Sequence, residues 1–370
     1  MTTFTINSRS LSRTLNDLSK AISSKPSLQI HRNFLLEAAD GHLTVTAADQ
    51  ETTAVRVLEL SSQEGDTRIL VDAAKLKQTV GKLPDCGLTF EITDGKLTIK
   101  TGKAKYSLVY YTDEFPRQTV SGEEPKSLPM PCEAFTAGIN AVSYAVSTEP
   151  IRPMMTGVLL DVLEDKTVFV ASDTHKLAKR AVDMTNPEQF RVIIPKKACD
   201  LITTLFKDND LVVTTDTKTL LVTDGVSSVY TTLIKGNYPA YDRVIPSVEG
   251  AVKATVDSVD LKAALDRVGD YASKASGLVK FTLVPMVGME LEATDLDFDT
   301  AATESVPCEY DGIQARVGLN CTHVREILKP LSGRADIYIL AENRPVLVTP
   351  SASTEGVSDI SITMPLAIQD

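Results

Sequence analysis

The sequence predicts an α+β fold in which one domain is repeated three times in tandem. Two markers recur with the same period. The first marker is a strand-like stretch that ends in two small residues and an aspartate, and its aspartates are Asp49, Asp173 and Asp295. The second marker is an arginine that opens a short apolar run, and its arginines are Arg68, Arg191 and Arg316. The intervals are 124 (49 to 173) and 122 (173 to 295) for the aspartates, and 123 (68 to 191) and 125 (191 to 316) for the arginines. A period this long gives each repeat enough residues for a core of its own.

Each repeat shows the same internal plan of a helix, strands, a second helix and further strands. Leu11, Leu15 and Leu18 lie on one face of a helix, because their spacing is four and three residues. The turn pairs Asp40-Gly41 and Asp224-Gly225 predict hairpins between strands. We therefore expect six helices, within residues 7–21, 72–83, 132–147, 195–208, 257–274 and 321–332.

The joints between repeats are short and rich in turn residues, at 121–125 and 247–250. They predict an N-terminal domain over 1–121, a central domain over 126–247 and a C-terminal domain over 250–370. Because each domain repeats a helix-plus-strands unit twice, the chain contains six such units.

The charge is unevenly distributed between the expected helices and the remaining chain. The protein has a formal net charge of −11, whereas the six helices together carry +4, which leaves −15 for all other residues. Basic helix faces are ordinary solvated surfaces in most proteins, and charge alone favours that interpretation. The functional alternative is a surface that meets nucleic-acid phosphates without reading base sequence.

No catalytic or metal-binding motif is found in the sequence. It has no phosphate-binding glycine loop, no GxSxG run, no paired histidines and no CxxC, so we expect no cofactor and no metal. The five cysteines are expected to be free thiols. Asp295, Asp297 and Asp299 alternate, which predicts an exposed polar strand face. Without a signal segment at the N-terminus or a long apolar run, we expect a cytoplasmic protein.

Three motifs carry a resemblance to a known family. Residues 171–178 read Ala-Ser-Asp-Thr-His-Lys-Leu-Ala, residues 238–246 read Tyr-Pro-Ala-Tyr-Asp-Arg-Val-Ile-Pro, and Met-Pro-Leu stands at 364–366 after Arg-Pro-Val-Leu-Val at 344–348. In this order and spacing they resemble the bacterial DNA polymerase III β subunit family, the sliding clamps. The resemblance covers the whole chain in length, threefold repeat and motifs.

The resemblance implies a non-catalytic DNA sliding clamp. Each domain would be a DNA-clamp domain, and two copies of the chain would join head to tail into a six-domain ring around duplex DNA. Helices would line the hole and sheets would form the outside. The implied partners are double-stranded DNA, a second copy of the chain, the replicative polymerase, a clamp loader and other proteins with a clamp-binding peptide of the Q-L-x-x-[LF] type.

The resemblance also assigns residues to three surfaces. The positions that match the partner-peptide cleft are Met155, Ser172, Thr174, His175, Lys176, Leu177, Pro239, Arg243, Val244, Asn320, His323, Val346, Met364, Pro365 and Leu366. The DNA-facing candidates are Arg9, Arg13, Lys20, Lys25, Lys75, Lys77, Arg152, Lys196, Lys197 and Lys262. The matches to the dimer interface are Tyr106, Leu108, Asp270, Tyr271 and Lys274.

The chain departs from the family pattern at several positions in the cleft motifs. Thr174 stands where the family usually has glycine, so the backbone there must accept a β-branched residue. Lys176 replaces the usual arginine and lacks its planar fork. Residues 367–370 extend beyond the usual end, and whether they cover part of the cleft stays open on the sequence alone.

Two alternatives to the clamp function stay open on the sequence alone. One is an enzyme on the repeated α+β scaffold, with an acid–base site near Asp173 and His175. The other is a clamp-like scaffold that never contacts DNA.

Overall fold

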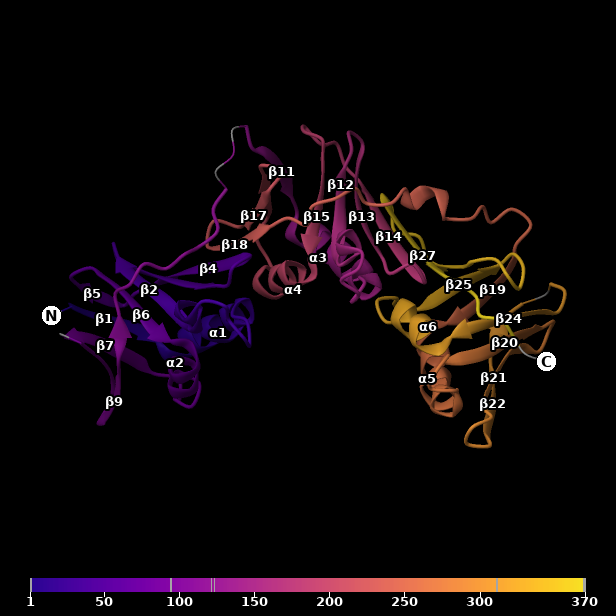
Figure 1. Ribbon diagram of the computed structural model, residues 1–370, viewed down its shortest axis with the longest axis horizontal. Coiled ribbons are helices and arrows are strands. Elements are labelled where there is room, and N and C mark those ends of the chain that lie inside the picture. Colours follow the sequence, from indigo (N-terminus) through magenta and orange to yellow (C-terminus); the bar gives the residue numbers. More distant parts are fainter. Residues whose placement is uncertain (1, 94, 121, 123, 311, 369–370) are drawn as a thin grey trace. The chain divides into compact units, whose positions relative to one another are not determined.

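The computed structural model describes residues 2–93, 95–120, 122, 124–310 and 312–368 (Figure 1). The chain divides into two compact units, one of Met1–Thr136 with Ile194–Leu233 and the other of Ala137–Ile193 with Ile234–Asp370. Each unit therefore holds parts of two successive repeats.

The order of helices and strands repeats three times, as the two sequence markers predict. The first pass comprises β1 (Thr2–Asn7), α1 (Ser8–Leu18), η1 (Ser19–Ala21), η2 (Gln29–Arg32), β2 (Asn33–Ala39), β3 (His42–Ala48), β4 (Thr52–Glu59), β5 (Ser62–Glu64), β6 (Thr67–Asp72), α2 (Ala73–Val80), β7 (Gly87–Thr93), β8 (Lys96–Thr101), β9 (Ala104–Leu108) and β10 (Tyr110–Tyr111).

The second and third passes keep this order with small changes. The second comprises β11 (Lys126–Met130), α3 (Cys132–Val142), η3 (Ser143–Ala145), η4 (Pro153–Met155), β12 (Gly157–Val162), β13 (Lys166–Ser172), β14 (Lys176–Asp183), β15 (Phe190–Pro195), α4 (Lys196–Leu205), β16 (Leu211–Thr215), β17 (Thr219–Thr223), β18 (Ser227–Thr232) and η5 (Tyr241–Arg243). The third comprises β19 (Val252–Asp257), α5 (Ser258–Val268), η6 (Gly269–Tyr271), β20 (Leu278–Val284), β21 (Gly288–Asp295), β22 (Thr300–Val306), β23 (Cys308–Glu309), β24 (Ala315–Asn320), α6 (Cys321–Leu328), β25 (Arg334–Ile339), β26 (Val346–Pro350) and β27 (Val357–Thr363).

All six expected helices are present, each within its predicted range. Polar residues that precede the helices explain where four of them begin, because a side-chain oxygen accepts backbone N–H groups of the first turn. Asn7, Asp72, Asp257 and Asn320 cap α1, α2, α5 and α6 in this way. The apolar face of α1 is buried as its spacing predicts, with Leu11, Leu15 and Leu18 excluded from solvent.

In the first unit, strands from two repeats form one continuous sheet. Its nine strands run in the order β10-β6-β2-β3-β4-β18-β17-β16-β11, and a second sheet has the order β5-β1-β7-β8-β9. The repeats meet where β4 pairs with β18 in antiparallel fashion, with Thr52 opposite Thr231. The predicted Asp40-Gly41 turn joins β2 and β3, and both residues adopt the positive φ that such a turn requires.

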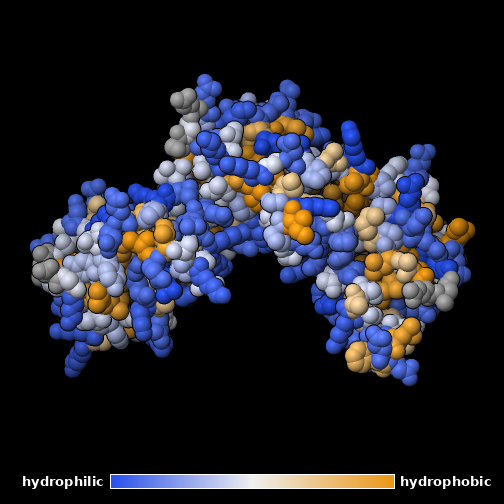
Figure 2. Space-filling view, viewed as in Figure 1, coloured by the Kyte–Doolittle hydropathy of each residue, from blue (hydrophilic) through white to orange (hydrophobic). Residues whose placement is uncertain are grey.

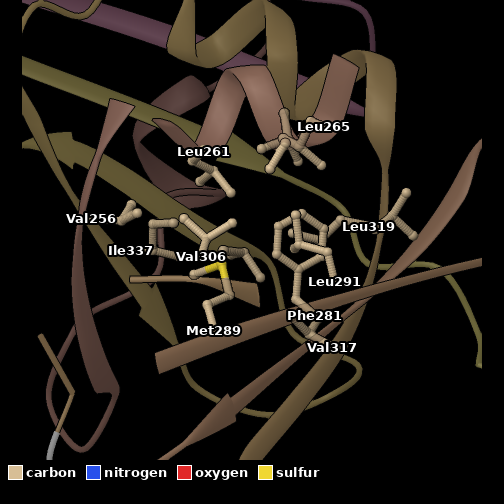
Figure 3. Close-up of a cluster of buried hydrophobic side chains, with 14 of the residues drawn as sticks. Val256, Leu261, Leu265, Phe281, Met289, Leu291, Val306, Val317, Leu319 and Ile337 are labelled. Carbon is tan, nitrogen blue, oxygen red and sulfur yellow. The ribbon is translucent and has the colours of Figure 1, made fainter. Parts of the chain in front are cut away.

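The second unit repeats this arrangement. Its nine-stranded sheet has the order β15-β12-β13-β14-β27-β26-β25-β19-β23, and its four-stranded sheet the order β22-β21-β20-β24. Here β14 pairs with β27, with Lys176 opposite Thr363. The four-stranded sheet packs on α5 and α6 around an apolar core that includes Leu261, Leu265 and Phe281 (Figure 3).

The two meeting points are equivalent positions of the repeat. In each repeat, the residue before the marker aspartate pairs with the second residue of the following strand. These second residues, Thr53, Leu177 and Ala301, are therefore equivalent positions. The final strands β9, β18 and β27 are aligned through the buried residue that each one pairs with. Leu108 pairs with Leu97, Thr231 with Leu220 and Thr363 with Val346. The pairs Thr52–Thr231 and Lys176–Thr363 therefore correspond, and the third pair in this series is Thr300 and Leu108.

Asp295, Asp297 and Asp299 do not lie on one strand face, so the prediction of an exposed polar strand face is wrong. β21 ends at Asp295, and Asp297 and Asp299 belong to the turn before β22. The Asp295 carboxylate accepts the N–H of Asp297, which stabilises a turn in place of a continued strand. Asp94, between β7 and β8 in the sequence, and Gln369 and Asp370 of the C-terminal extension lie outside the described residues.

Candidate functional site

The second unit contains a cavity of about 640 Å³ where strands of two successive repeats pair. It is lined by the loop between β13 and β14, by η4, by the segment around η5 and by the end of β27. The lining residues are Arg152, Met154, Met155, Ser172, Thr174, His175, Lys176, Leu177, Asn237, Tyr238, Pro239, Ala240, Tyr241, Val244, Pro345, Ile362 and Met364.

The floor and the rim of this cavity are both apolar, and the floor is buried whereas the rim is accessible. Leu177 and Ile362 pair across β14 and β27 and are both buried. On the rim, Val244 is 52% exposed and Met364 is 42% exposed. Large apolar side chains that remain accessible beside a concave apolar floor are typical of a binding site for apolar side chains of a partner.

A charged cluster fixes one wall of the cavity. The ammonium of Lys176, with a side chain only 8% exposed, lies 2.5 Å from a carboxylate oxygen of Asp173 and 3.1 Å from one of Glu326. Burial raises the pKa of Asp173, but hydrogen bonds from Lys176 and from backbone N–H groups outweigh burial and hold that pKa below its usual value. The cluster joins the β13–β14 loop to α6 of the following repeat.

The two histidines of the predicted cleft also meet at this wall. The rings of His175 and His323 stack with centroids 6.1 Å apart and planes inclined by 30°. Asn320 places His323 by accepting its backbone N–H as the cap of α6. His323 stands behind His175 and does not line the cavity.

The backbone at Thr174 is strained, in agreement with the expectation, drawn from the resemblance, that this position favours glycine. Its φ is 82°, a region that β-branched residues rarely adopt. The loop is held by Asp173, whose carboxylate accepts the N–H groups of His175 and Lys176, and by Ser172, whose hydroxyl accepts the N–H of Thr174. These three hydrogen bonds fix the edge of the cavity formed by 172–176.

The corresponding position in the first unit is filled by polar contacts. Leu177 of the cavity floor corresponds to Thr53, whose hydroxyl accepts the N–H of Gln118. The Gln118 amide also donates to the carbonyl of Gln50. The chain after the first repeat therefore lies against β4, whereas the chain after the second repeat forms η5 and leaves the cavity open.

Of the fifteen predicted cleft residues, nine line the cavity. They are Met155, Ser172, Thr174, His175, Lys176, Leu177, Pro239, Val244 and Met364. Val346 is fully buried in the core, and its neighbour Pro345 lines the cavity instead. Arg243 is an exposed residue of η5, Asn320 caps α6, and Pro365 and Leu366 lie beyond the cavity.

Several lining residues were not assigned to the cleft from the sequence. Arg152 was assigned to the DNA-facing set, but it lines the cavity. Tyr238 and Tyr241 stand in the quoted motif on either side of Pro239 and Ala240, and both are largely buried side chains that line the cavity. Ile362 was missed although it lies on the same strand face as the rim residue Met364, which the alternation of a strand could have indicated.

The DNA-facing candidates lie on helices and nearby loops, but they differ in how free their charges are. Lys196, Lys197 and Lys262 form ion pairs with Asp200, Asp49 and Asp266. Lys20 and Lys77 donate hydrogen bonds to the hydroxyls of Thr204 and Ser19. Arg9 and Arg13 line a cavity of about 510 Å³ beside α1, with Arg56 and Lys207 among the other lining residues. Lys25 and Lys75 are exposed.

The dimer-interface candidates lie in two places. Tyr106 and Leu108 belong to β9, the outer strand of the five-stranded sheet. Asp270 and Tyr271 form η6, which follows α5, and the ammonium of Lys274 lies 5.9 Å from the ring centre of Phe298.

The comparisons with known proteins decide the family. Residues 2–119 match the family model of the DNA polymerase III β subunit N-terminal domain, and residues 129–240 match that of its central domain. The chain belongs to the bacterial DNA polymerase III β subunit family, the β sliding clamps.

Relatives and solved structures agree with this family along the whole chain. The β sliding clamp of Bacillus subtilis is 26% identical over 95% of this chain and 97% of its own length. That of a Synechocystis strain is 29% identical, over 92% and 93%. The β subunit of Streptococcus pyogenes superposes with a TM-score of 0.90 at 24% identity, covering 99% and 100%. A Pseudomonas aeruginosa clamp solved with bound griselimycin gives 0.89 at 23%, also covering 99% and 100%. The predicted α+β clamp fold is confirmed.

Membership in this family makes the chain a non-catalytic processivity subunit, and the enzyme alternative near Asp173 and His175 is wrong. Both oxygens of Asp173 are occupied by the loop backbone and by Lys176. Among the described residues, no His, Cys, Asp and Glu side chains gather into a group of three that suits a metal ion. The described part of the chain has no helix that is long and apolar enough to cross a membrane.

Proposed function

We propose that this chain encircles duplex DNA as a head-to-tail homodimer and holds its partners through the cavity beside His175. The proposal assigns three domains, 1–121, 126–247 and 250–370, a peptide-binding cleft, a ring joint and a set of DNA-facing residues. It also places the protein in the cytoplasm, where bacterial replication occurs. The open apolar cavity of about 640 Å³ is the observation that carries the partner-binding role.

The cavity suits a short peptide with two or three apolar anchors. Leu177 and Ile362 offer a buried apolar floor, and Met364 has the flexibility to adapt to different side chains. Arg152 and His175 offer polar groups at the edge that can fix the register of a peptide. A motif of the Q-L-x-x-[LF] type has the amide and the anchors that this surface requires.

Binding of a fluorescent peptide of that type tests the assignment. We expect Val244→Glu to weaken binding by tenfold or more, because it places a charge on an apolar rim, at a cost of about 1–3 kcal/mol. Val248→Glu is the matched control, since Val248 is 44% exposed, lies four residues away and does not line the cavity. Equal binding by the Val244→Glu variant and the control would place the peptide elsewhere.

The ring joint is supported by two long sheet edges that nothing covers in the described part of one chain. An exposed strand edge presents free backbone N–H and C=O groups and is normally shortened, blocked or paired. β5, β10 and β23 are edges of two or three residues, and β11 contains Pro129. β15 receives the N–H of Ile234, and β24 that of Leu366. The remaining edges are β9 and β22.

The repeat specifies how these two edges pair between subunits. Because Thr300 and Leu108 correspond to the pairs already formed inside the chain, the joint places Leu108 opposite Thr300 of the partner, Ser107 opposite Ala301 and Tyr106 opposite Ala302. Burial supports this register. Tyr106, Leu108 and Ala302 are half-buried, whereas Ser107 and Ala301 are exposed. In this register, half-buried residues of β9 therefore lie opposite half-buried residues of β22, and exposed residues lie opposite exposed ones.

Exposed apolar residues lie next to both of these strands, β9 and β22. Val109 after β9 is 62% exposed, and Phe298 in the turn before β22 is 68% exposed. Figure 2 shows a hydrophobic patch at the tip where Figure 1 draws the β21–β22 turn. In the first unit η1 packs on α4, where the ammonium of Lys197 donates to the carbonyl of Ala21. Because Tyr271 ends η6 as Ala21 ends η1, and Ala74 is the second residue of α2 as Lys197 is of α4, the equivalent contact in the joint places Tyr271 near Ala74 of the partner subunit.

The DNA-facing role rests on basic helix residues that form no ion pair with any other described residue. Arg9 and Arg13 lie on the exposed side of α1, with its apolar residues buried on the other side. Their contacts with phosphates would be independent of sequence and sensitive to salt.

Retention on a closed circular plasmid, compared with retention on the same plasmid cut once, tests encirclement. We expect the protein to stay on the circle at high salt and to leave the linear form, whereas equal loss from both forms would contradict a closed ring.

A further inference from the structure

In the described part of the chain, an isolated backbone bridge attaches the C-terminal segment to the four-stranded sheet of the second unit. The N–H of Leu366 donates to the carbonyl of Gly318 over 2.8 Å, in an isolated antiparallel bridge to the outer strand β24. The described part of the 367–370 extension thus lies against β24 and does not line the cavity.

Gly318 is the residue that makes room for this segment. A Cβ at this position would lie 2.6 Å from the carbonyl oxygen of Leu366, 2.8 Å from Leu278 Cδ1 and 3.0 Å from Ile368 Cγ1. The closest of these atoms belongs to the backbone and cannot rotate away. Gly318 is also absent from the positive-φ residues, so its backbone conformation alone does not require glycine. The absence of a side chain here serves the passage of the C-terminal segment.

The attachment at Gly318 bears directly on the cleft through Met364. The N–H of Met364 donates to the carbonyl of His175 over 2.8 Å, and its side chain lines the cavity. Two residues later, Leu366 is held by Gly318. Pro365 between them has a fixed φ, which limits how far Met364 can move while both anchors hold.

We propose that Gly318 is a positioning residue for the partner cleft. It holds the segment 366–368 on β24, and that segment in turn keeps Met364 at the rim. Gly318 itself lies outside the cavity lining, so it acts on a bound peptide only through Met364. This proposal rests on the assignment of the cavity as a peptide cleft.

The test measures peptide affinity in a cycle of variants. We expect Gly318→Ala to weaken binding of the fluorescent peptide by about fivefold to tenfold, and deletion of residues 366–370 to do the same. Because both changes act through Met364, their effects should largely disappear in a Met364→Ala background. Gly87→Ala is the matched control, since Gly87 lies in a strand where a Cβ would meet nothing closer than 3.8 Å.

A second readout separates this proposal from the cleft assignment. A Met364→Cys variant is labelled with a maleimide, and the labelling rate is compared with and without Gly318→Ala. Faster labelling in the Gly318→Ala background, together with the loss of affinity, supports the proposal. The proposal is overturned if Gly318→Ala leaves the labelling rate of Met364→Cys unchanged. It is also overturned if Gly318→Ala lowers the affinity equally in the Met364→Ala background and in the unaltered chain. Failure of the unaltered chain to bind the peptide would instead overturn the cleft assignment, while the labelling result would still decide whether Gly318 positions Met364.

Discussion

His175 stacks on His323 across the wall of the cleft, so that an imidazole from the β13–β14 loop rests on one from α6. Burial, together with the nearby Lys176 ammonium and His175, holds the pKa of His323 below its usual 6.5, against the opposing effect of Asp173 and Glu326. A lowered histidine pKa means that the unfolded chain takes up a proton before the folded chain does. Stability from this group is therefore present above pH 6.5 and decreases as the pH falls below that value.

Replacing His323 with glutamine should reduce this pH dependence. We expect urea unfolding of the unaltered chain to show a free energy that decreases between pH 7 and pH 5.5, by less than the limit of about 1.4 kcal/mol per pH unit for one proton, because the imidazole is partly solvated. His323→Gln should show a smaller slope, whereas His42→Gln on the exposed surface should leave it unchanged. Identical slopes for the His323→Gln variant and the unaltered chain would show that this histidine does not titrate as described.

The strained backbone at Thr174 predicts a stabilising substitution. Thr174→Gly removes a β-branched side chain from a φ of 82°, a relief of about 1–3 kcal/mol that is partly offset by the greater flexibility of glycine in the unfolded chain. We expect a net gain of about 1 kcal/mol in the free energy of unfolding. Thr217→Gly is a matched control, because Thr217 has a φ of 73° in a similar aspartate-held loop outside the cavity. A loss of stability in both variants would show that neither loop is strained.

Removal of the Lys176 ammonium should destabilise the second unit. Lys176→Met leaves Asp173 and Glu326 without their shared cation, which we expect to lower the free energy of unfolding by about 3 kcal/mol. Lys196→Met is the control, since its ion pair with Asp200 is a solvated pair within one helix, worth under about 0.5 kcal/mol. Chemical denaturation at pH 7 measures both effects, and equal losses would mean that the Lys176 cluster contributes no more than a surface pair.

The exposed arginines of α1, Arg9 and Arg13, predict a change in the salt dependence of DNA binding. Arg9→Ala combined with Arg13→Ala should weaken binding to a fluorescent duplex and reduce the slope of log affinity against log salt by up to about 2, since each phosphate contact contributes about 0.9. Lys196→Ala with Lys262→Ala removes the same charge from residues that are engaged in ion pairs, so we expect a smaller change. A larger effect of the second pair would assign the DNA contacts to different helices.

The threefold plan of the chain could be predicted from the sequence, because the helices carry apolar faces and α1, α2, α5 and α6 begin at a capping side chain. Leu11, Leu15 and Leu18 become the buried face of α1, and Asn7 and Asp257 cap helices at equivalent positions. The Asp295 marker misled the strand assignment, because a side-chain hydrogen bond to Asp297 turns the chain at a place where alternation alone predicts extension.

The cleft could be predicted only in part, since the motifs give its loops and not the contacts between them. Lys176 and Glu326 are 150 positions apart (176 to 326), and no local pattern indicates their ion pair. The buried position of Val346 and the cavity-facing position of Pro345 depend on which face of β26 meets the core. That choice is set by packing against the neighbouring strand.

A site-specific cross-link at the ring joint tests the head-to-tail dimer most directly. The variant Ser107→Cys with Ala301→Cys places two thiols opposite each other on the exposed face of the proposed β9–β22 pair, whereas Ser107→Cys with Ala302→Cys places them on opposite faces. On oxidation, the account predicts that the first variant forms a covalent dimer of about 80 kDa, twice the 40.0 kDa chain, and the second does not. A chain that stays monomeric, or that forms open-ended polymers, would contradict the closed ring.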